Sequence, residues 1–459
     1  MERRPRVDYA QASEWLLKLT NPERTGLTRR FGRRMNLDAT WRLMELLGNP
    51  HEQIHAVHIA GTKGKGSVAA MIESVLRTAD YRTGLFTSPH LVSWRERIRI
   101  DGRCISEQQV ADLAEEVRPA VEQVEAEGLR GPSFFEALTA MGMLAFSREG
   151  LDVCVLETGL GGRLDATNVV TPALSIITTL GLDHTSVLGD TLPEIATQKA
   201  GIIKPDVPVV VAPQPESIER LMRRKAASVQ APITFATAFT LLECRPLSPD
   251  ESAPGELPRI GERVAGEFGG VAFEASLPLS GRHQAVNAAV AGRACEMLRT
   301  QGMRLPLESF TRGLEEMYWP ARVELVGTHP WEVIDCAHNQ ASARALMNAL
   351  SRHLQYDRMI LVLGASKDKP VEAMAQELAS ADHAILTEAS LLRALPVEHL
   401  AERTASAWRS FETIIAPTEA LDRARELAGP RDLICVTGSV FVVGELMEEG
   451  RFSTRLCGL

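Results

Sequence analysis

The chain has 459 residues, of which 45% are hydrophobic and 24% are charged, so its composition is that of a globular protein and not of a disordered or fibrous one. This length allows about two or three domains. The 50 basic and 59 acidic residues give a net charge of −9. Since no long basic run accompanies that charge, bulk binding to nucleic acid or to a membrane surface is excluded, and an anionic ligand must be held by a local site.

The sequence also favours a cytoplasmic location. No apolar run approaches the roughly 18 residues of a membrane-spanning helix, and no apolar signal core follows the N-terminal arginines. The seven cysteines are scattered and form no Cys-x-x-Cys pair, which predicts reduced thiols and no zinc site.

The first part of the chain alternates short apolar runs with longer segments of helical period. Strands are predicted at residues 54–60, 151–156, 174–179 and 207–212, and an amphipathic helix at 68–79. Such alternation indicates βαβ units and a mostly parallel sheet.

A second series of strands is predicted late in the chain, at residues 331–336, 359–363, 384–387 and 433–437. Between the two series, residues 244–270 are rich in Pro, Gly and charge and predict an irregular insertion or a small β-region. We therefore expect two α/β domains, residues 1–320 and 321–459, joined near Trp319-Pro320.

The segment Gly61-Thr62-Lys63-Gly64-Lys65-Gly66-Ser67 joins the first predicted strand to the first predicted helix. Glycines let backbone amides turn toward a phosphate chain, the helix N-terminus adds partial positive charge, and Lys65 adds a full one. Gly66 separates the lysine from the hydroxyl residue, so the spacing departs from the common P-loop. The segment predicts a nucleotide-phosphate site rather than an ordinary glycine turn.

Polar side chains follow the ends of the next two strands. Glu157 ends a buried strand, where an acid beside a phosphate loop is placed to bind Mg²⁺. Asp165 shortly after it is either part of that site or a helix cap. Asp183-His184 follows the third strand, and His184 is a metal or water ligand or one half of a polar pair.

Four further residues are candidates for a site at the edge of the sheet or for ordinary structural roles. Asp335 ends a strand of the second series and could hold a ribose or adenine edge, whereas the nearby Asn339 could simply cap a helix. Arg322 could reach a phosphate across the cleft or be one of many solvated arginines. Lys199, judged by its spacing alone, is an exposed helical lysine.

Together these motifs resemble the folylpolyglutamate synthase/dihydrofolate synthase family, the folate branch of the Mur ligase superfamily. The run from Gly159 to Asn168, Gly-Leu-Gly-Gly-Arg-Leu-Asp-Ala-Thr-Asn, is the most specific match, while the phosphate loop alone indicates only a Mur ligase. Further matches follow the family's order along nearly the whole chain, at residues 87–91, 96–98, 135–139, 182–185, 199–202, 335–339 and 437–439.

The resemblance implies an α/β fold, in which a P-loop ATPase domain with a parallel sheet precedes a smaller Rossmann-like domain. It also implies catalysis in the cleft between them, with Lys65, Lys199 and His184 as the catalytic residues. The implied ATP-binding residues are Gly61, Thr62, Gly64, Lys65, Gly66, Ser67, Asn287, Arg322 and Asp335. The implied ligands of two Mg²⁺ ions are Ser88, Glu157, His184 and a carbamylated Lys199, and the implied pteroate-binding residues are Ser133 and Phe135.

The activity implied is ATP-dependent ligation of L-glutamate to a folate, through an acyl phosphate, by a monomer. Whether dihydropteroate is also an acceptor is left open by these residues. Where the family usually has Pro-Gly-Arg this chain has Pro320-Ala321-Arg322, which is expected to change the flexibility of the linker and not the chemistry. The alternatives are a peptidoglycan-precursor Mur ligase, disfavoured by the short segment before the loop, and a regulatory ATP-binding module.

Overall fold

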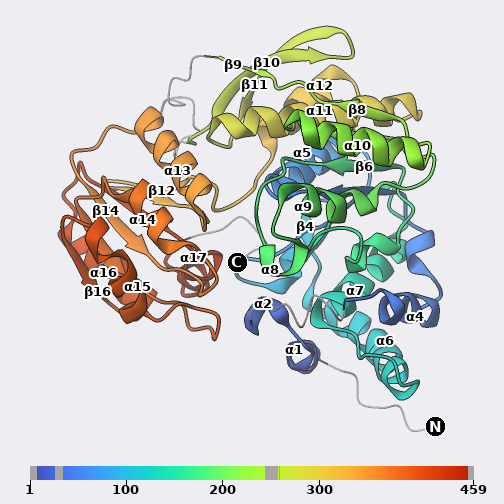
Figure 1. The fold of residues 1–459 in the computed structure, drawn as a ribbon, viewed down its shortest axis with the longest axis horizontal. Helices are drawn as coiled ribbons and strands as arrows, with labels where there is room; N and C mark the ends of the chain where they lie inside the picture. Colours follow the sequence, from blue (N-terminus) through green and yellow to red (C-terminus); the bar gives the residue numbers. More distant parts are fainter. Residues whose placement is uncertain (1–7, 26–34, 243–256, 258, 453–459) are drawn as a thin grey trace.

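A computed structural model describes residues 8–25, 35–242, 257 and 259–452, and their helices pack around three sheets (Figure 1). We call the part up to Glu316 the first lobe and the part from Glu324 the second lobe; residues 317–323 form the linker. In Figure 1 the second lobe is the orange to red part on the left.

An eight-stranded sheet, within the described residues, forms the centre of the first lobe in the order β4-β3-β2-β5-β1-β6-β7-β8. Its strands are β1 (Ala56–Ala60), β2 (Thr83–Phe86), β3 (Ile98–Ile100), β4 (Arg103–Cys104), β5 (Val153–Glu157), β6 (Leu174–Ile177), β7 (Val209–Val211) and β8 (Ile233–Phe235). In the order of the sheet, the six strands from β2 through β5, β1, β6 and β7 to β8 pair in parallel. The strand β3 pairs antiparallel with both β2 and β4. Because β1 lies between β5 and β6, its carboxyl end faces the crevice where ligands of open α/β sheets bind.

Helices cover both faces of this sheet and bury separate apolar clusters. One face carries α5 (Lys65–Thr78), α11 (Arg282–Thr300) and α12 (Leu307–Glu316). The other carries α1 (Tyr9–Lys18), α4 (Asp38–Leu46), α6 (Glu107–Ala126) and α7 (Phe134–Glu149), while α9 (Leu192–Lys199) and α10 (Glu216–Ser228) pack beside β6 and β7. Short helices complete the lobe: α2 (Pro22–Thr25), α8 (Thr185–Leu188), and the 3-10 turns η1 (Pro50–Glu52), η2 (Trp94–Arg97), η3 (Ala166–Val169) and η4 (Ala200–Ile202).

A small antiparallel sheet, β11-β10-β9, adds to the first lobe, with strands β9 (Thr240–Leu241), β10 (Glu262–Phe268) and β11 (Val271–Leu277). The prediction of a small β-region is confirmed for the described part of residues 244–270. Residues 243–256 and 258 lie outside the described residues.

The second lobe is built on a six-stranded sheet, within the described residues, of order β12-β13-β17-β14-β15-β16. Its strands are β12 (Glu324–Thr328), β13 (Trp331–Ile334), β14 (Met359–Leu363), β15 (His383–Leu386), β16 (Phe411–Thr413) and β17 (Leu433–Thr437), and only β12 pairs antiparallel. Apolar clusters on its two faces are covered by α13 (Gln340–His353), α14 (Val371–Leu378) and α15 (Val397–Thr404) on one side, and by α16 (Pro417–Leu427) and α17 (Val440–Glu448) on the other. The turn η6 (Ala405–Ala407) follows α15.

The cysteine prediction is wrong at one position. Cys154, Cys295, Cys336 and Cys435 are free and buried, but Cys104 is disulfide-bonded. The spacing of cysteines along a chain does not show which thiols the fold brings within bonding distance. None of the helices in the described ranges is long and apolar enough to cross a membrane.

Gly313 sets how closely α12 packs on α5, the helix that carries the phosphate loop. A Cβ at Gly313 would lie 2.5 Å from Val75 Cα and 2.8 Å from Val75 N. Alanine raises intrinsic helix propensity by about 1 kcal/mol, but contact with a backbone must push the helices apart. We therefore expect Gly313→Ala to lower the free energy of unfolding by about 1–3 kcal/mol in urea titrations.

The matched control is Glu316→Ala at the exposed end of the same helix, which should change that free energy by less than about 0.5 kcal/mol. A more stable Gly313→Ala variant would contradict the close packing of α12 on α5.

Candidate active site

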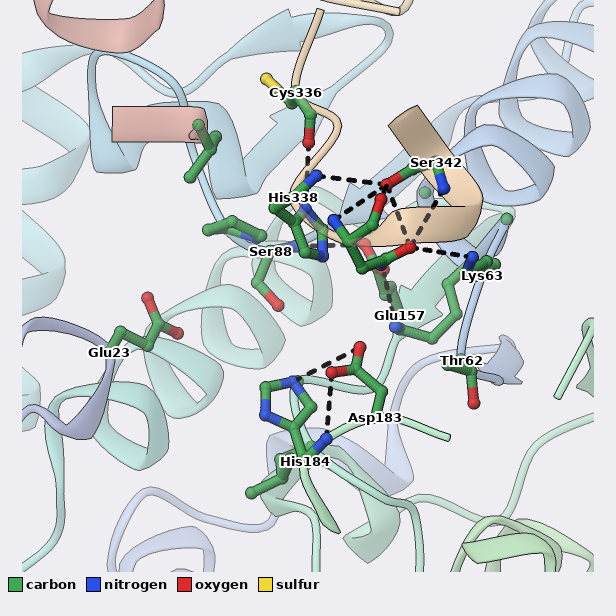
Figure 2. A pocket seen from close by; sticks show the side chains of 18 of the residues that line it. Glu23, Thr62, Lys63, Ser88, Glu157, Asp183, His184, Cys336, His338 and Ser342 are labelled. Carbon is green, nitrogen blue, oxygen red and sulfur yellow. Dashed lines mark hydrogen bonds and ion pairs between the residues drawn. The ribbon is translucent and has the colours of Figure 1, made fainter. Parts of the chain in front are cut away.

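A cavity of about 740 Å³ is lined by residues of both lobes (Figure 2). It brings together most of the predicted site residues: Thr62, Gly64, Lys65, Gly66, Ser67, Ser88, Ser133, Phe135, Glu157, His184, Asn287, Arg322 and Asp335. Gly61 and Lys199 are not among its lining residues. The predicted residues, which are far apart in the sequence, are therefore gathered around one space.

The phosphate loop connects β1 to α5 as predicted. Gly64 caps α5 with φ +84°, and a Cβ there would lie 2.3 Å from Asn287 Oδ1, so only glycine suits this position. The backbone amides of Thr62 and Lys63 donate to Thr179 O, each at 3.1 Å, which ties the loop to the end of β6. The loop opens a helix of 14 residues, whose N-terminus attracts anions.

Glu157 lies at the carboxyl end of β5, beside the loop. Its Oε1 is 3.7 Å from Lys65 Nζ, and its Oε2 accepts a hydrogen bond of 3.1 Å from Ser88 N. Burial raises the pKa of this carboxyl group, because few partners compensate its charge. A nearby cation would relieve that cost.

The donor set around Glu157 suits one kind of metal site. Among the described residues no group of three or more His, Cys, Asp or Glu could hold a metal ion. Glu157, Ser88 and His184 all line the cavity, and a carboxylate beside a phosphate loop suits Mg²⁺, which takes one or two carboxylates together with phosphate oxygens and water. This donor set does not fit a metal enclosed entirely by protein ligands.

Lys199 is buried beneath the phosphate loop, so its interpretation as an exposed helical lysine is wrong. It ends α9, and its Nζ donates to Gly61 O at 2.6 Å. Burial, together with the charge of Lys65, lowers its pKa to about 7. The neutral amine is therefore far easier to form here than in an exposed lysine. Spacing could not show this, because one buried lysine on a helix breaks no pattern.

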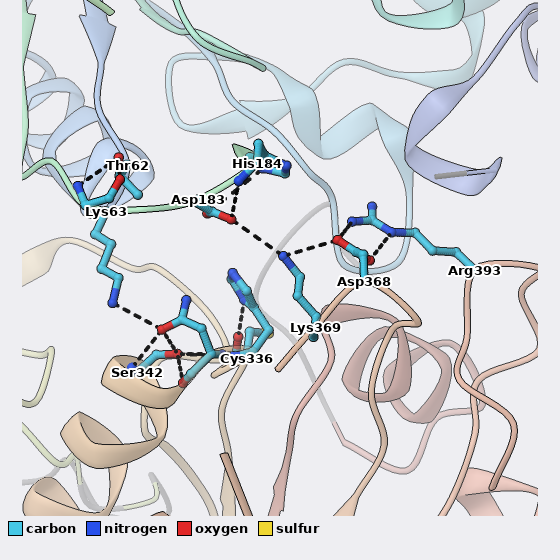
Figure 3. Close-up of polar contacts among 12 residues, drawn as sticks. Thr62, Lys63, Asp183, His184, Cys336, Ser342, Asp368, Lys369 and Arg393 are labelled. Atoms are coloured by element: carbon cyan, nitrogen blue, oxygen red, sulfur yellow. Dashed lines mark hydrogen bonds and ion pairs between the residues drawn. The ribbon is translucent and has the colours of Figure 1, made fainter. Parts of the chain in front are cut away.

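His184 and Asp183 stand at the end of the strand next to β1 (Figure 3). His184 has φ +49°, and its backbone N–H donates to Asp183 Oδ1 at 3.0 Å. Burial lowers the pKa of His184 to about 4, and the charges of Lys369 and Lys65 add to this effect. The imidazole is therefore neutral at physiological pH, as a metal ligand must be.

Two cations of the second lobe reach this part of the first. Lys369 Nζ is 3.8 Å from Asp183 Oδ1 and 3.6 Å from Asp368 Oδ2, and Arg393 binds both oxygens of Asp368 at 3.0 and 2.9 Å (Figure 3). On the other side of the cavity, Lys63 Nζ donates to Asn339 Oδ1 at 3.1 Å. The cleft is thus bridged by polar contacts.

The side chains of Asp335 and Asn339 both accept hydrogen bonds from backbone amides. Asp335 accepts the amides of Val323 and Ala337 at 3.0 and 2.7 Å, and Asn339 caps α13. The capping alternative for Asn339 is confirmed, and the side chain also binds Lys63. Asp165 likewise caps η3, as its second interpretation predicted. A nucleotide contact of Asp335 stays a prediction.

The end of the cavity predicted to hold pteroate is formed by the start of α7. Ser133 caps this helix, and its hydroxyl donates to Glu136 Oε2 at 2.7 Å. Arg130 binds both oxygens of Glu136, at 2.6 and 2.9 Å. A Cβ at Gly159 would lie 2.5 Å from Phe135 Cζ, so this glycine leaves room for the tip of the ring.

Two family models match the chain: the Mur ligase middle domain over residues 59–295 and the Mur ligase glutamate ligase domain over residues 321–440. A dihydrofolate synthase/folylpolyglutamate synthase of Bacillus subtilis is 33% identical over 422 residues, covering 91% of this chain and 95% of that protein. The chain belongs to this family of Mur ligases.

Two other relatives extend the comparison. A protein of Haloferax volcanii, named as a probable bifunctional folylpolyglutamate synthase/dihydropteroate synthase, is 36% identical over 96% of this chain, but the chain spans only 50% of its length. The structure of E. coli FolC in complex with DHPP and ADP has a TM-score of 0.81 and 26% identity, covering 98% of this chain and 99% of that one.

Sequence reasoning missed four cavity residues of this family member, namely Glu23, Arg130, Lys369 and Arg393. Glu23 comes from α2 and binds the buried Arg97 through both oxygens, at 2.9 and 2.5 Å. Its main-chain oxygen accepts from Arg393 at 3.3 Å. Each is an ordinary charged residue in a loop or short helix, so no local pattern marks it.

The pair Glu23–Arg97 should make stability depend on pH. Burial favours the neutral acid, but Arg97 and Arg393 outweigh burial and lower the pKa of Glu23 below its ordinary 4.5. The ionised Glu23 side chain therefore stabilises the fold fully above its ordinary pKa of 4.5, and this stabilisation is lost as the pH falls through the lowered pKa. We expect Glu23→Gln to cost about 2 kcal/mol in the free energy of unfolding at pH 7.

Urea unfolding across pH should show that the difference in the free energy of unfolding between the wild type and Glu23→Gln stays constant down to about pH 5. Below that pH the difference should become smaller. Glu14→Gln serves as the control, because the Glu14–Lys18 pair is exposed and solvent screening leaves it little effect on stability at any pH. A difference in the free energy of unfolding that grows as the pH falls would contradict the lowered pKa assigned to Glu23.

Proposed function

We propose that this protein joins L-glutamate to a folate, and also to dihydropteroate, in an ATP-dependent reaction that releases ADP and phosphate. The observation that carries the proposal is the shared cavity. It holds a phosphate loop with Lys65, a buried carboxylate at Glu157, and a second pocket end at Ser133 and Phe135. The relatives named for this activity, including the E. coli structure with DHPP and ADP, support it.

The chemistry requires an activated acceptor, because a carboxylate oxygen is a poor leaving group. A carboxylate oxygen of the folate attacks the γ-phosphorus of ATP, the bond from that phosphorus to the β–γ bridging oxygen breaks, and an acyl phosphate and ADP form. The amine of glutamate then attacks the acyl carbon. The tetrahedral intermediate loses phosphate, the amine loses a proton, and an amide results.

The residues of the cavity would serve mainly to position the phosphates and to neutralise their charge, as phosphoryl transfer requires. The loop amides at the start of α5 and Lys65 would bind the phosphate chain, and Arg322 would approach it from the linker. Glu157, Ser88 and His184 would hold Mg²⁺, which supplies charge neutralisation between phosphate oxygens. We assign residues 1–320 to an ATPase domain with the folate site and 321–459 to a ligase domain, whose approach would exclude water from the acyl phosphate.

Lys199 would act as a carbamate. Its neutral amine adds to the carbon of CO₂: an N–C bond forms, a C=O π bond opens onto oxygen, and the nitrogen releases a proton. The lowered pKa of Lys199 supports this step, since only the neutral amine has a free electron pair. The product would be an anion below the phosphate loop, and we propose that it serves a second Mg²⁺.

Phosphate release from Mg-ATP with L-glutamate tests the function, with dihydropteroate, tetrahydrofolate or no acceptor in parallel. We expect release with each acceptor and little without one. Lys65→Ala should abolish release while its circular dichroism stays that of the wild type, which shows that the signal comes from this cavity. Release with only one acceptor would restrict the proposal to that branch, and release independent of acceptor and glutamate would indicate a regulatory ATPase.

The carbamate is tested by Lys199→Ala. We expect activity to fall about 100-fold and to return in part when acetate or formate is added, because a small carboxylate can occupy the vacated space. Lys65→Ala is the control, since a carboxylate cannot replace its positive charge and should restore nothing. Full activity of Lys199→Ala would remove this lysine from the site.

A further inference from the structure

A tryptophan of the linker lies directly on the phosphate loop. A Cβ at Gly66 would be 2.6 Å from Trp319 Cζ2 and 3.2 Å from Trp319 Cε2. Gly66 is the second residue of α5 and does not have a positive φ. The requirement for glycine at this position therefore comes from the space that the indole occupies and not from the backbone conformation. The same Cβ would be 3.5 Å from Glu157 Oε2, so the contact adjoins the reacting centre.

The indole is supported by a buried cation. Arg99 Cζ lies 5.1 Å from the ring centroid of Trp319, within the range of a cation–π contact. Arg99 is itself buried, and its Nε donates to Glu96 O at 3.0 Å. Trp319 also packs against the apolar cluster formed by β1, α5 and α11. Its ring therefore has a fixed place relative to the first lobe.

The linker that carries Trp319 is tied equally firmly to the second lobe. Glu324, at the start of β12, accepts from the Tyr318 hydroxyl at 2.9 Å and from Ala321 N at 2.7 Å. Ala321 and Val323 both have φ +53°, a strained conformation for residues with a side chain. Asp335 accepts the Val323 amide, which helps to hold that conformation. Trp319 thus lies where two fixed parts of the molecule meet.

We propose that Trp319 is a positioning residue, whose indole fixes the position of the phosphate loop relative to Arg322 and to the second lobe. Gly66, the residue by which this loop departs from the common P-loop spacing, is then glycine because the indole fills the place of its side chain. The inference rests on the proposed ATP site and adds to it a residue outside the phosphate-binding motif. It also implies that a change in the linker would alter the binding of the nucleotide.

A double-mutant cycle tests the pairing, with Gly66→Ala, Trp319→Ala and the double variant compared in kcat and in KM for ATP. Gly66→Ala should raise KM for ATP and lower kcat/KM for ATP by about 100-fold, because the added methyl group displaces the loop. In the Trp319→Ala background the same change should cost at least about tenfold less, since the space is now open. Effects that simply multiply would overturn the proposal.

A ligand-binding measurement separates positioning from general packing. ADP should change the tryptophan fluorescence of the wild type, and Trp319→Phe, which keeps an aromatic ring on the loop, should abolish most of that change while retaining more activity than Trp319→Ala. Trp331→Phe is the matched control, because Trp331 lies in β13 with its Nε1 donating to Gln355 O, and the variant should respond as the wild type does. An undiminished response in Trp319→Phe would overturn the proposal.

Calorimetric titration of the wild type with ADP separates a failure of the proposed function from a failure of the role assigned to Trp319. ADP binding together with multiplicative effects in the cycle would overturn the role of Trp319 and leave the proposed function standing. Failure of the wild type to bind ADP would overturn both. Thermal unfolding of every variant shows whether it folds, and Trp319→Phe keeps the test available if Trp319→Ala does not.

Discussion

Charge buried at one edge of the large sheet is the constraint on which the site depends. Glu157, Asp165 and Lys199 are all buried near the phosphate loop or the loop after β5, and the pKa of each shifts toward the value that favours its neutral form. A charge in such a place is costly unless a partner of opposite sign is present. The parallel strands hold these groups at fixed positions, so their charges are best compensated when phosphates and cations bind. The free protein is therefore arranged for ligands that it does not itself supply.

The two lobes meet across this edge through contacts of another kind. Lys369–Asp183 and Lys63–Asn339 join polar atoms at distances of 3.8 and 3.1 Å, around a cavity open enough to admit substrates. Both pairs are partly buried, so each holds a polar side chain of the second lobe against the first. Most of each large apolar cluster lies within one lobe, but Ile260 of the first lobe belongs to a cluster of the second, and Leu91 and Val92 pack against another. A partly buried ion pair also joins the lobes, because Glu262 of β10 binds Arg352 of α13 at 2.9 Å. Apolar and ionic contacts therefore connect the lobes in addition to the polar pairs at the cavity.

Much of this arrangement could be predicted from the sequence, because strands and the phosphate loop have local signals. The strands at residues 359–363 and 433–437 were predicted to the residue, and the bounds of β1 and β5 were predicted to within two residues. Burial of Lys199 and the cavity positions of Glu23, Lys369 and Arg393 could not be predicted from the residues alone, since each depends on which segments the fold brings together. The contact of Trp319 with Gly66 shows the same limit: the sequence marks both residues, but only the fold pairs them.

Ala321 has a consequence for how the lobes move. A glycine at this position could pass between left- and right-handed backbone conformations at little cost, and would make the connection a loose tether. A residue with a Cβ leaves the left-handed region only by crossing a steric barrier, and here it is held by Glu324 as well. The linker is thus held in one conformation at Ala321, so any reorientation of the second lobe would have to come from rotation about bonds on either side of this residue.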